Sequence, residues 1–195
     1  MISGQVTEYR LAVFGLQGAG KTSFVKKICY GDMGQTEPTT EEYQDTAIFD
    51  KTFVYLWDFP QQYVSSSNAD DIIIGFGGAI FIIDATQLSK IEEIREYFED
   101  LMKSHLISDI PFIFLCTKMD LVEDETQVKP TVIVKEIMKN TKKFQCILFS
   151  SKTGEGIDQF QHWIVNFAKP AFQSNFSPDQ TSSNFVSQTN MKVLN

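Results

Sequence analysis

Apolar residues gather in runs of strand length, and stretches with a helical period separate these runs. Five runs are apolar at nearly every position and rich in β-branched and aromatic side chains, which is typical of strands covered on both faces of a sheet. They are Tyr9–Phe14, Thr52–Trp57, Gly78–Asp84, Pro111–Thr117 and Gln145–Ser150. A weaker run at Tyr43–Phe49 predicts a sixth strand at an edge of the sheet.

Three segments between these runs carry apolar side chains at the spacing of an amphipathic helix. In the clearest one, apolar residues from Ile91 to Met102 share one face and four glutamates lie opposite. Similar stripes occur at Val132–Met138 and from Ile157 to Phe167. This alternation favours an α/β domain in which about five helices flank a six-stranded, mainly parallel sheet.

The composition changes near residue 170, where a stretch poor in charge and rich in Ser, Asn and Gln begins. We expect one folded domain over residues 1–169 and a disordered tail over 170–195, because such a composition buries too little apolar surface to fold. The alternative is that Phe172, Phe176 and Phe185 hold the tail against the domain.

The overall composition is that of an ordinary globular domain, since 43% of the 195 residues are apolar and 22% are charged. A net charge of −8 argues against nucleic acid as a partner. The longest apolar run, 72–83, is too short to span a bilayer, so we expect a cytoplasmic protein without its own membrane anchor, which a partner recruits to any membrane. Cys29, Cys116 and Cys146 have apolar neighbours, which predicts buried free thiols.

The first apolar strand is followed by GLQGAGKTS, which matches the pattern of a phosphate-binding loop. Its glycines let the backbone curl so that successive N–H groups point at a phosphate, and the following helix adds the partial positive charge of its N-terminus. We expect Lys21 to neutralise phosphate charge and the Thr22 hydroxyl to bind Mg²⁺. The predicted nucleotide-binding residues here are Gly15, Gln17, Gly18, Ala19, Gly20, Lys21, Thr22 and Ser23.

The segment TKMD, Thr117–Asp120, follows another apolar strand and is expected to select the base of the nucleotide. Ligands of an open α/β sheet bind at the C-terminal ends of its strands, where this segment lies. The Asp120 carboxylate accepts from N1–H and the exocyclic amine of guanine, whereas adenine presents a lone pair at N1. Lys118 is expected to lay its aliphatic stem along the base.

These motifs resemble those of a small GTPase of the Ras superfamily, closest in layout to its Arf-like branch, from about Tyr9 to Phe167. The resemblance rests on five motifs in order: Gly15–Thr22, Thr39 after Pro38, Trp57–Asp58, Thr117–Asp120 and Ser150–Lys152. They place switch I at Thr39 and switch II from Asp58 onward, with the interswitch strands between. Trp57–Pro60 also resembles, locally, the corresponding motif of the Rag branch.

The resemblance implies a P-loop G domain that binds GTP or GDP with Mg²⁺. It implies that Thr39 joins Thr22 in the metal shell and that Asp58 holds a metal-bound water. In the base loop Ser150–Lys152, the Ser151 amide is implied to contact the guanine carbonyl.

Switch II departs from the family pattern. Gln62, four residues after Asp58, matches the water-orienting glutamine, but Gln61 stands where the family has a glycine whose N–H contacts the γ-phosphate. A residue with a Cβ resists the left-handed region that glycine enters freely, and Pro60 fixes its own φ near −65°. Strain of about 1–3 kcal/mol predicts a γ-phosphate-bound state disfavoured roughly ten- to a hundredfold, or a loop preset in one state. In the phosphate loop, Gln17 is expected to crowd the path of a partner's arginine.

The sequence predicts a guanine-nucleotide switch that hydrolyses GTP slowly, with Lys21 and Gln62 as catalytic residues. The alternative is a nucleotide-holding interaction module without hydrolysis, while Asp120 and the base loop disfavour a P-loop kinase or ATPase. We expect effectors or regulators to bind at switch I, the interswitch and switch II. Trp57 is expected to be a core or interswitch residue, and the alternative is that Phe49, Trp57 and Tyr63 contact a partner. Association with another GTPase or an adaptor also fits such a module.

Overall fold

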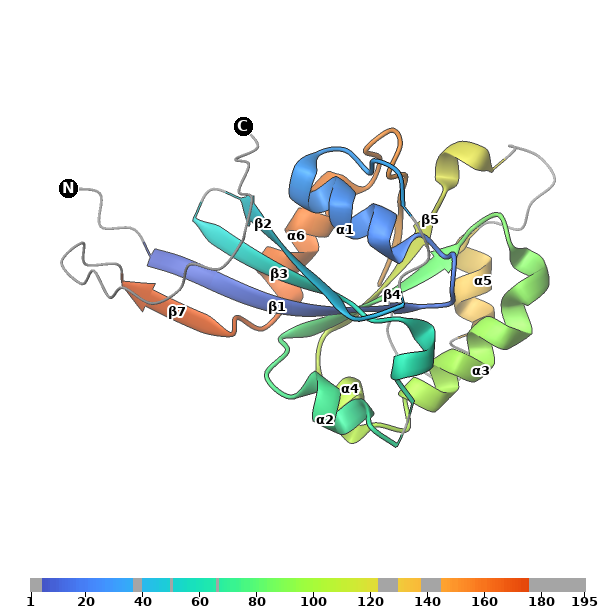
Figure 1. Ribbon diagram of the computed structural model, residues 1–195, viewed down its shortest axis with the longest axis horizontal. Coiled ribbons are helices and arrows are strands. Elements are labelled where there is room, and N and C mark those ends of the chain that lie inside the picture. The colour runs from blue at the N-terminus through green and yellow to red at the C-terminus, as the bar shows by residue number, and fades with distance from the viewer. Residues whose placement is uncertain are drawn as a thin grey trace.

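The predicted strands join one sheet, which helices cover on both faces (Figure 1). The computed structural model describes residues 5–36, 40–49, 51–65, 67–122, 130–137 and 145–175. Its strands are β1 Gln5–Gly15, β2 Tyr43–Phe49, β3 Thr52–Asp58, β4 Gly78–Asp84, β5 Phe112–Thr117, β6 Gln145–Leu148 and β7 Phe172–Asn175. The predicted six strands follow the order β2-β3-β1-β4-β5-β6, with the weak run β2 at an edge, as expected.

Strand pairing in this path is parallel except at one edge. β1 pairs with β3 and β4, and β5 pairs with β4 and β6, all in parallel, whereas β2 runs antiparallel to β3. The α/β class with a mainly parallel sheet is therefore confirmed. Because parallel strands end on the same side, the segments that follow β1, β3, β4 and β5 converge at one edge of the sheet.

The helices fall into two layers, one on each face of the sheet (Figure 1). Their bounds are α1 Lys21–Tyr30, α2 Ala69–Ile73, α3 Ile91–Leu101, α4 His105–Asp109, α5 Pro130–Ile137 and α6 Ile157–Phe167, with 3₁₀ turns η1 Gln61–Tyr63, η2 Leu88–Lys90 and η3 Met119–Leu121. Helices α1 and α6 pack on one face, and α2 to α5 pack on the other. The three amphipathic stripes of the sequence correspond to α3, α5 and α6.

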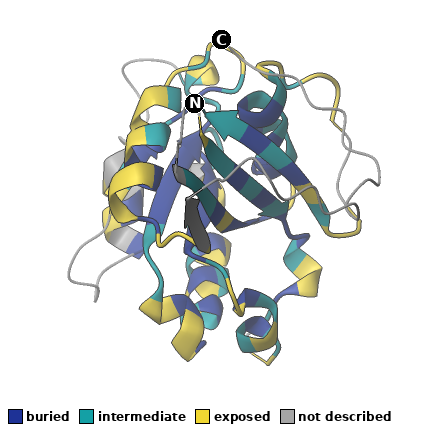
Figure 2. Cartoon of the chain, turned by 90° about the vertical axis from the view of Figure 1, so that its left-hand side faces the viewer, coloured by how far each residue is buried: buried dark blue, intermediate teal, exposed yellow. Residues whose placement is uncertain are grey.

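Aromatic side chains fill both layers of the core. Phe24 of α1 packs edge-on against Phe149 and Phe160 on one side of the sheet, with ring centroids 5.2 and 5.0 Å away. On the other side, Phe81 of β4 meets Phe98 of α3 at 5.4 Å. Figure 2 shows buried strands inside the sheet, partly exposed strands toward the β2–β3 edge, and helices whose outer surfaces are exposed.

The three thiols are free, as the sequence predicts. Cys29 and Cys116 are buried, whereas Cys146 on β6 is only half-buried. Burial raises the pKa of Cys29, so it remains a neutral thiol that packs like a small apolar side chain.

The end of the domain differs from the prediction. Folded structure continues past residue 169, because β7 pairs antiparallel with the N-terminal part of β1, with Asn175 opposite Gln5. The Ala171 N–H donates to the carbonyl oxygen of Glu8 at 2.7 Å and leads the chain into this strand. The first half of β1 extends beyond the start of β4, which leaves a free edge that β7 occupies. Residues 176–195, including Phe176 and Phe185, lie outside the described part of the chain.

We predict that Gly77→Ala destabilises the fold. The Gly77 N–H donates to the backbone carbonyl oxygen of Arg10 at 2.8 Å, and the Gly77 carbonyl oxygen accepts from the Lys169 N–H at 2.7 Å. A methyl group added at Gly77 would overlap with the Lys169 carbonyl oxygen, so one of these backbone bonds must break. Chemical denaturation should show a loss of about 1–3 kcal/mol in the free energy of unfolding.

The control is Glu96→Ala on the exposed face of α3, which should change that free energy by less than about 0.5 kcal/mol. Equal stabilities of the two variants would contradict the role assigned to Gly77.

Candidate functional site

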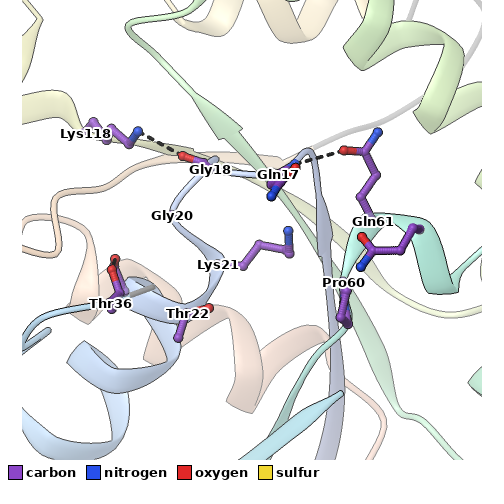
Figure 3. Close-up of a pocket in the computed structure, with 11 residues that line it drawn as sticks. Gln17, Gly18, Gly20, Lys21, Thr22, Thr36, Pro60, Gln61 and Lys118 are labelled. Carbon is purple, nitrogen blue, oxygen red and sulfur yellow. Dashed lines mark hydrogen bonds between the residues drawn. The ribbon is translucent and has the colours of Figure 1, made fainter. Parts of the chain in front are cut away.

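A cleft opens at the sheet edge where β1, β3 and β5 end (Figure 3). Its lining comes from the loop after β1, the start of α1, the segment after α1, the segment after β3 and the residue after β5. The residues that line it are Gln17, Gly18, Gly20, Lys21, Thr22, Ser23, Thr36, Pro60, Gln61, Gln62 and Lys118. Most of them belong to the nucleotide site that the sequence predicts.

The loop between β1 and α1 has the backbone shape of a phosphate-binding loop. Gly15, Gly18 and Gly20 have φ values of 145°, 76° and 96°, a region that residues with a Cβ rarely enter. Gly20 caps the N-terminus of α1, so the positive end of the helix dipole faces the cleft. The predicted phosphate loop thus forms between a strand and a helix, which is the context that the motif requires.

Lys21 lies with its ammonium group folded beneath this loop. Its side chain is buried, and Nζ donates to the carbonyl oxygens of Gly15 at 3.0 Å and Leu16 at 3.1 Å. An ammonium group has three donors, so one remains beyond these two bonds for an anion in the cleft. Burial lowers the pKa of Lys21, while the nearby carboxylate of Asp58 acts in the opposite direction.

Thr22 and Asp58 place two oxygen atoms together at the floor of the site. The Thr22 hydroxyl donates to Asp58 Oδ2 at 2.5 Å, and Asp58 is fully buried at the end of β3. Among the described residues, no group of three or more His, Cys, Asp or Glu side chains could hold a metal ion. The third metal ligand implied by the sequence, Thr39, lies outside the described residues.

Two residues at the end of β5 tie the base motif to the phosphate loop. The Thr117 hydroxyl lies 2.6 Å from the carbonyl oxygen of Ala19 and is buried. Lys118 takes a left-handed conformation with φ of 61°, and its Nζ donates to the Gly18 carbonyl oxygen at 2.9 Å. The two predicted motifs therefore border one cleft.

The sequence analysis missed Asp84 and Thr36. Asp84 at the end of β4 forms an ion pair of 2.6 Å with Lys118, in which the Asp84 side chain is buried and the Lys118 side chain is 33% exposed. The sequence could have indicated Asp84 as a site residue, because it is the polar residue at the end of an apolar strand, as Thr117 is. Thr36 lines the cleft 3.3 Å from the Ser23 hydroxyl and had no recognisable pattern around it.

The two motifs predicted to bind guanine contact each other. The buried Ser150 hydroxyl donates to Asp120 Oδ1 at 2.5 Å, and the Thr153 N–H donates to the Ser150 oxygen at 3.1 Å. Asp120 itself is exposed, so its carboxylate is accessible to a ligand. Within the predicted loop, Ser151 is half-buried and Lys152 is exposed.

Switch II begins as the continuation of β3 and then turns sharply. The Phe59 ring is buried and stacks on Phe14 and Trp57, with centroids 5.7 and 6.3 Å apart. Pro60 follows with φ of −58° and ψ of 139°, and Gln61 then opens the 3₁₀ turn η1. The aromatic stack thus fixes the point from which the turn departs.

The strain expected at Gln61 is absent in this conformation. Among the described residues, Lys118 is the only non-glycine with a positive φ, so Gln61 lies in an ordinary backbone region. Its side chain makes the contact instead, because Oε1 accepts from the backbone N–H of Gln17 at 2.9 Å (Figure 3). Switch II and the phosphate loop therefore bind each other across the cleft through Gln61 and Gln17.

Comparison with known proteins gives the family. The model of the ADP-ribosylation factor family, Arf, matches residues 1–168. The chain belongs to the Arf family of small GTPases. It is 25% identical to ADP-ribosylation factor-like protein 2 of Arabidopsis thaliana over 162 residues, which cover 81% of this chain and 86% of that protein. It is 24% identical to ADP-ribosylation factor K of Dictyostelium discoideum over 160 residues, which cover 80% and 84%.

A solved structure shows the same fold. The Arl6 BBS3 small GTPase of Trypanosoma brucei, determined with the nucleotide analogue GppNp, superposes with a TM-score of 0.66 at 15% identity and covers 82% of this chain and 96% of its own. The Arf-like layout predicted from the sequence is confirmed, and the family identifies a GTP-binding regulatory switch of a kind that generally hydrolyses GTP to GDP. The local Rag resemblance of Trp57–Pro60 is not confirmed by these relatives.

We predict that Thr117→Val weakens binding of guanine nucleotide. The change keeps the shape of the side chain but leaves the Ala19 carbonyl oxygen without its buried donor, which frees the phosphate loop from β5. An unsatisfied buried group costs about 1–3 kcal/mol, so fluorescence titration with GDP should show an affinity loss of about tenfold.

Thr46→Val on β2 is the matched control, since this half-buried threonine is remote from the cleft. The same GDP affinity in both variants would refute the role assigned to the Thr117–Ala19 hydrogen bond.

Proposed function

We propose that this Arf-family chain binds GTP and GDP together with Mg²⁺ in the cleft of Figure 3 and hydrolyses GTP slowly. The observation that carries the proposal is the direct joining of the two motifs: Thr117 bonds to Ala19, and Lys118 bonds to Gly18. One cleft therefore offers amides and a lysine to the phosphates, next to a carboxylate that reads the base.

Guanine is the base that the Asp120 carboxylate favours. Ser150 donates to one of its oxygens and holds the group in place, and an ionised carboxylate has further lone pairs for N1–H and the exocyclic amine. Adenine has no N1 proton, so a carboxylate there faces a lone pair. The proposed contact between the Ser151 amide and the guanine carbonyl adds to this selection.

The oxygen pair of Thr22 and Asp58 fits Mg²⁺. Magnesium prefers oxygen ligands and keeps several waters, so a hydroxyl and one carboxylate beside bound phosphates are a sufficient protein contribution. Thr39 is proposed as the further ligand that switch I supplies. When bound, the ion supplies positive charge against the phosphate oxygens.

Hydrolysis depends on two residues of this chain. Lys21 stabilises charge on the transferred phosphate, and Gln62, which lines the cleft, orients the attacking water. Slow turnover follows from the neighbouring residues, because Pro60 has a fixed φ and Gln61 is bound to Gln17. In the nucleotide-holding alternative, the same groups bind GTP and no turnover occurs.

Partner proteins are proposed to read the interswitch and switch II. A groove on the α2 side of the sheet is lined by Arg10, Glu42, Trp57, Phe59, Ile72, Ile74 and Phe76. Phe49 packs on the opposite face, against the α1 layer, so it does not share a surface with Trp57. Tyr63 in η1 is 47% exposed and stays a candidate contact.

A partner is also the proposed means of placing this chain at a membrane, from a cytoplasmic pool. Across the part of the chain that the structure describes, no helix is long and apolar enough to traverse a bilayer.

The purified protein should contain guanine nucleotide and no adenine nucleotide, as chromatography of the acid-released ligand will show. Asp120→Ala removes the base-reading carboxylate and should empty the site or lower GDP affinity at least about tenfold. Asp158→Ala, an exposed carboxylate on α6, is the control and should retain its nucleotide. Recovery of ADP from the wild type would refute the proposal.

A single-turnover assay with GTP tests hydrolysis. We expect a rate constant below about 10⁻³ per second without a partner, and a further fall in Gln62→Ala because the water is no longer oriented. GTP that stays intact would favour the nucleotide-holding alternative. A rate near that of a partner-stimulated GTPase would contradict slow turnover.

A further inference from the structure

The cleft has two ends, and a diphosphate and a triphosphate would reach different distances from one end toward the other. Lys118, which follows the base motif on β5, lines one end, and Pro60, Gln61 and Gln62 line the other. The phosphate loop runs between these ends (Figure 3). A nucleotide with its base beside Asp120 therefore extends its phosphates toward Gln61, which only the outermost phosphate of a triphosphate meets.

The Gln61 side chain already uses a phosphate-loop donor at that end. Its Oε1 accepts from the Gln17 N–H at 2.9 Å, and Figure 3 shows the bond bridging the loop and switch II. An amide oxygen and a phosphate oxygen are both acceptors, while a backbone N–H has a single proton. A third phosphate that approaches Gln17 must therefore displace Gln61 or forgo this donor.

The turn that carries Gln61 is held on both sides. Before it, Phe59 is buried in its aromatic stack, and the Phe59 N–H donates to Val13 at 3.2 Å. After it, Val64 is buried, and the Asn68 side chain donates to the Tyr63 carbonyl oxygen at 2.7 Å.

The helix after the turn is anchored as well. Asp70 in α2 accepts from the Ser104 hydroxyl and from the Leu106 N–H, which ties this helix to α4. The turn that carries Gln61 is thus already ordered. The bond between the Gln61 side chain and Gln17 therefore costs little additional conformational entropy.

We propose that Gln61 is a specificity-determining residue that selects nucleoside diphosphate over triphosphate. Its amide oxygen takes the place of an oxygen of the third phosphate on the Gln17 N–H, so a diphosphate fits the cleft with this bond intact, whereas a triphosphate breaks the bond or loses this donor. This inference rests on the proposed binding of guanine nucleotide in the cleft. The preference for diphosphate then arises because the Gln61 amide oxygen and a phosphate oxygen compete for the Gln17 N–H, and not because the backbone at Gln61 is strained.

The test compares affinities for GDP and for a non-hydrolysable GTP analogue, measured by calorimetry with Mg²⁺ present. Gln61→Ala removes the competing acceptor and should raise the triphosphate-to-diphosphate affinity ratio about two- to tenfold, the range expected for one hydrogen bond. Gln61→Glu keeps an acceptor and adds a negative charge, so its ratio should fall below that of the wild type. Gln159→Ala, a surface glutamine on α6, is the control and should leave the ratio unchanged.

The ratio is taken within each variant, so a partly unfolded sample does not alter it. An unchanged ratio in Gln61→Ala would overturn the inference while leaving the proposed function in place. A shift in Gln61→Gly that Gln61→Ala lacks would also overturn it, because the backbone would then be responsible. A wild-type protein that binds neither nucleotide overturns both.

Discussion

One buried hydrogen bond joins the halves of the nucleotide cleft: the Thr117 hydroxyl donates to the Ala19 carbonyl oxygen at 2.6 Å, across 98 residues of chain. It fixes the phosphate loop against the end of β5, from which the base motif continues. Lys118 adds a second link to the same loop and is itself held by Asp84. Because the parallel sheet brings these strand ends to one edge, two short bonds are enough to hold the phosphate loop beside the predicted base motif.

Switch II combines a fixed start with an unusual side-chain contact. The stacked rings of Phe14, Trp57 and Phe59 anchor the chain before Pro60, whose dihedral angle is fixed by its ring. A glycine at position 61, as in the family pattern, would let the backbone change conformation and donate its own N–H to the γ-phosphate. With Gln61 in that place, the backbone stays in an ordinary region and the side chain reaches the phosphate loop. The proposed selection between nucleotide states therefore depends on a hydrogen-bond acceptor, which a ligand can displace.

The sequence located the strands, the amphipathic helices and the order of the motifs. Apolar runs such as Gly78–Asp84 and the stripe of α3 are local patterns, and burial in a two-layer α/β fold selects for them directly. The phosphate loop was equally predictable, because its glycines and Lys21 need only a strand before and a helix after. Less could be read at the C-terminal end, where β7 has four residues and forms only because β1 offers it a free edge.

The sequence by itself thus determined the fold class, the family motifs and most of the residues that border the cleft. Only the tertiary structure decided that Gln61 meets Gln17, that Asp84 holds Lys118, and that Phe49 and Trp57 face opposite sides of the sheet. The physical reason is that such pairings depend on backbone dihedral angles and side-chain directions at positions far apart in the chain. Packing of the whole domain fixes those angles, and no local pattern of residues carries them.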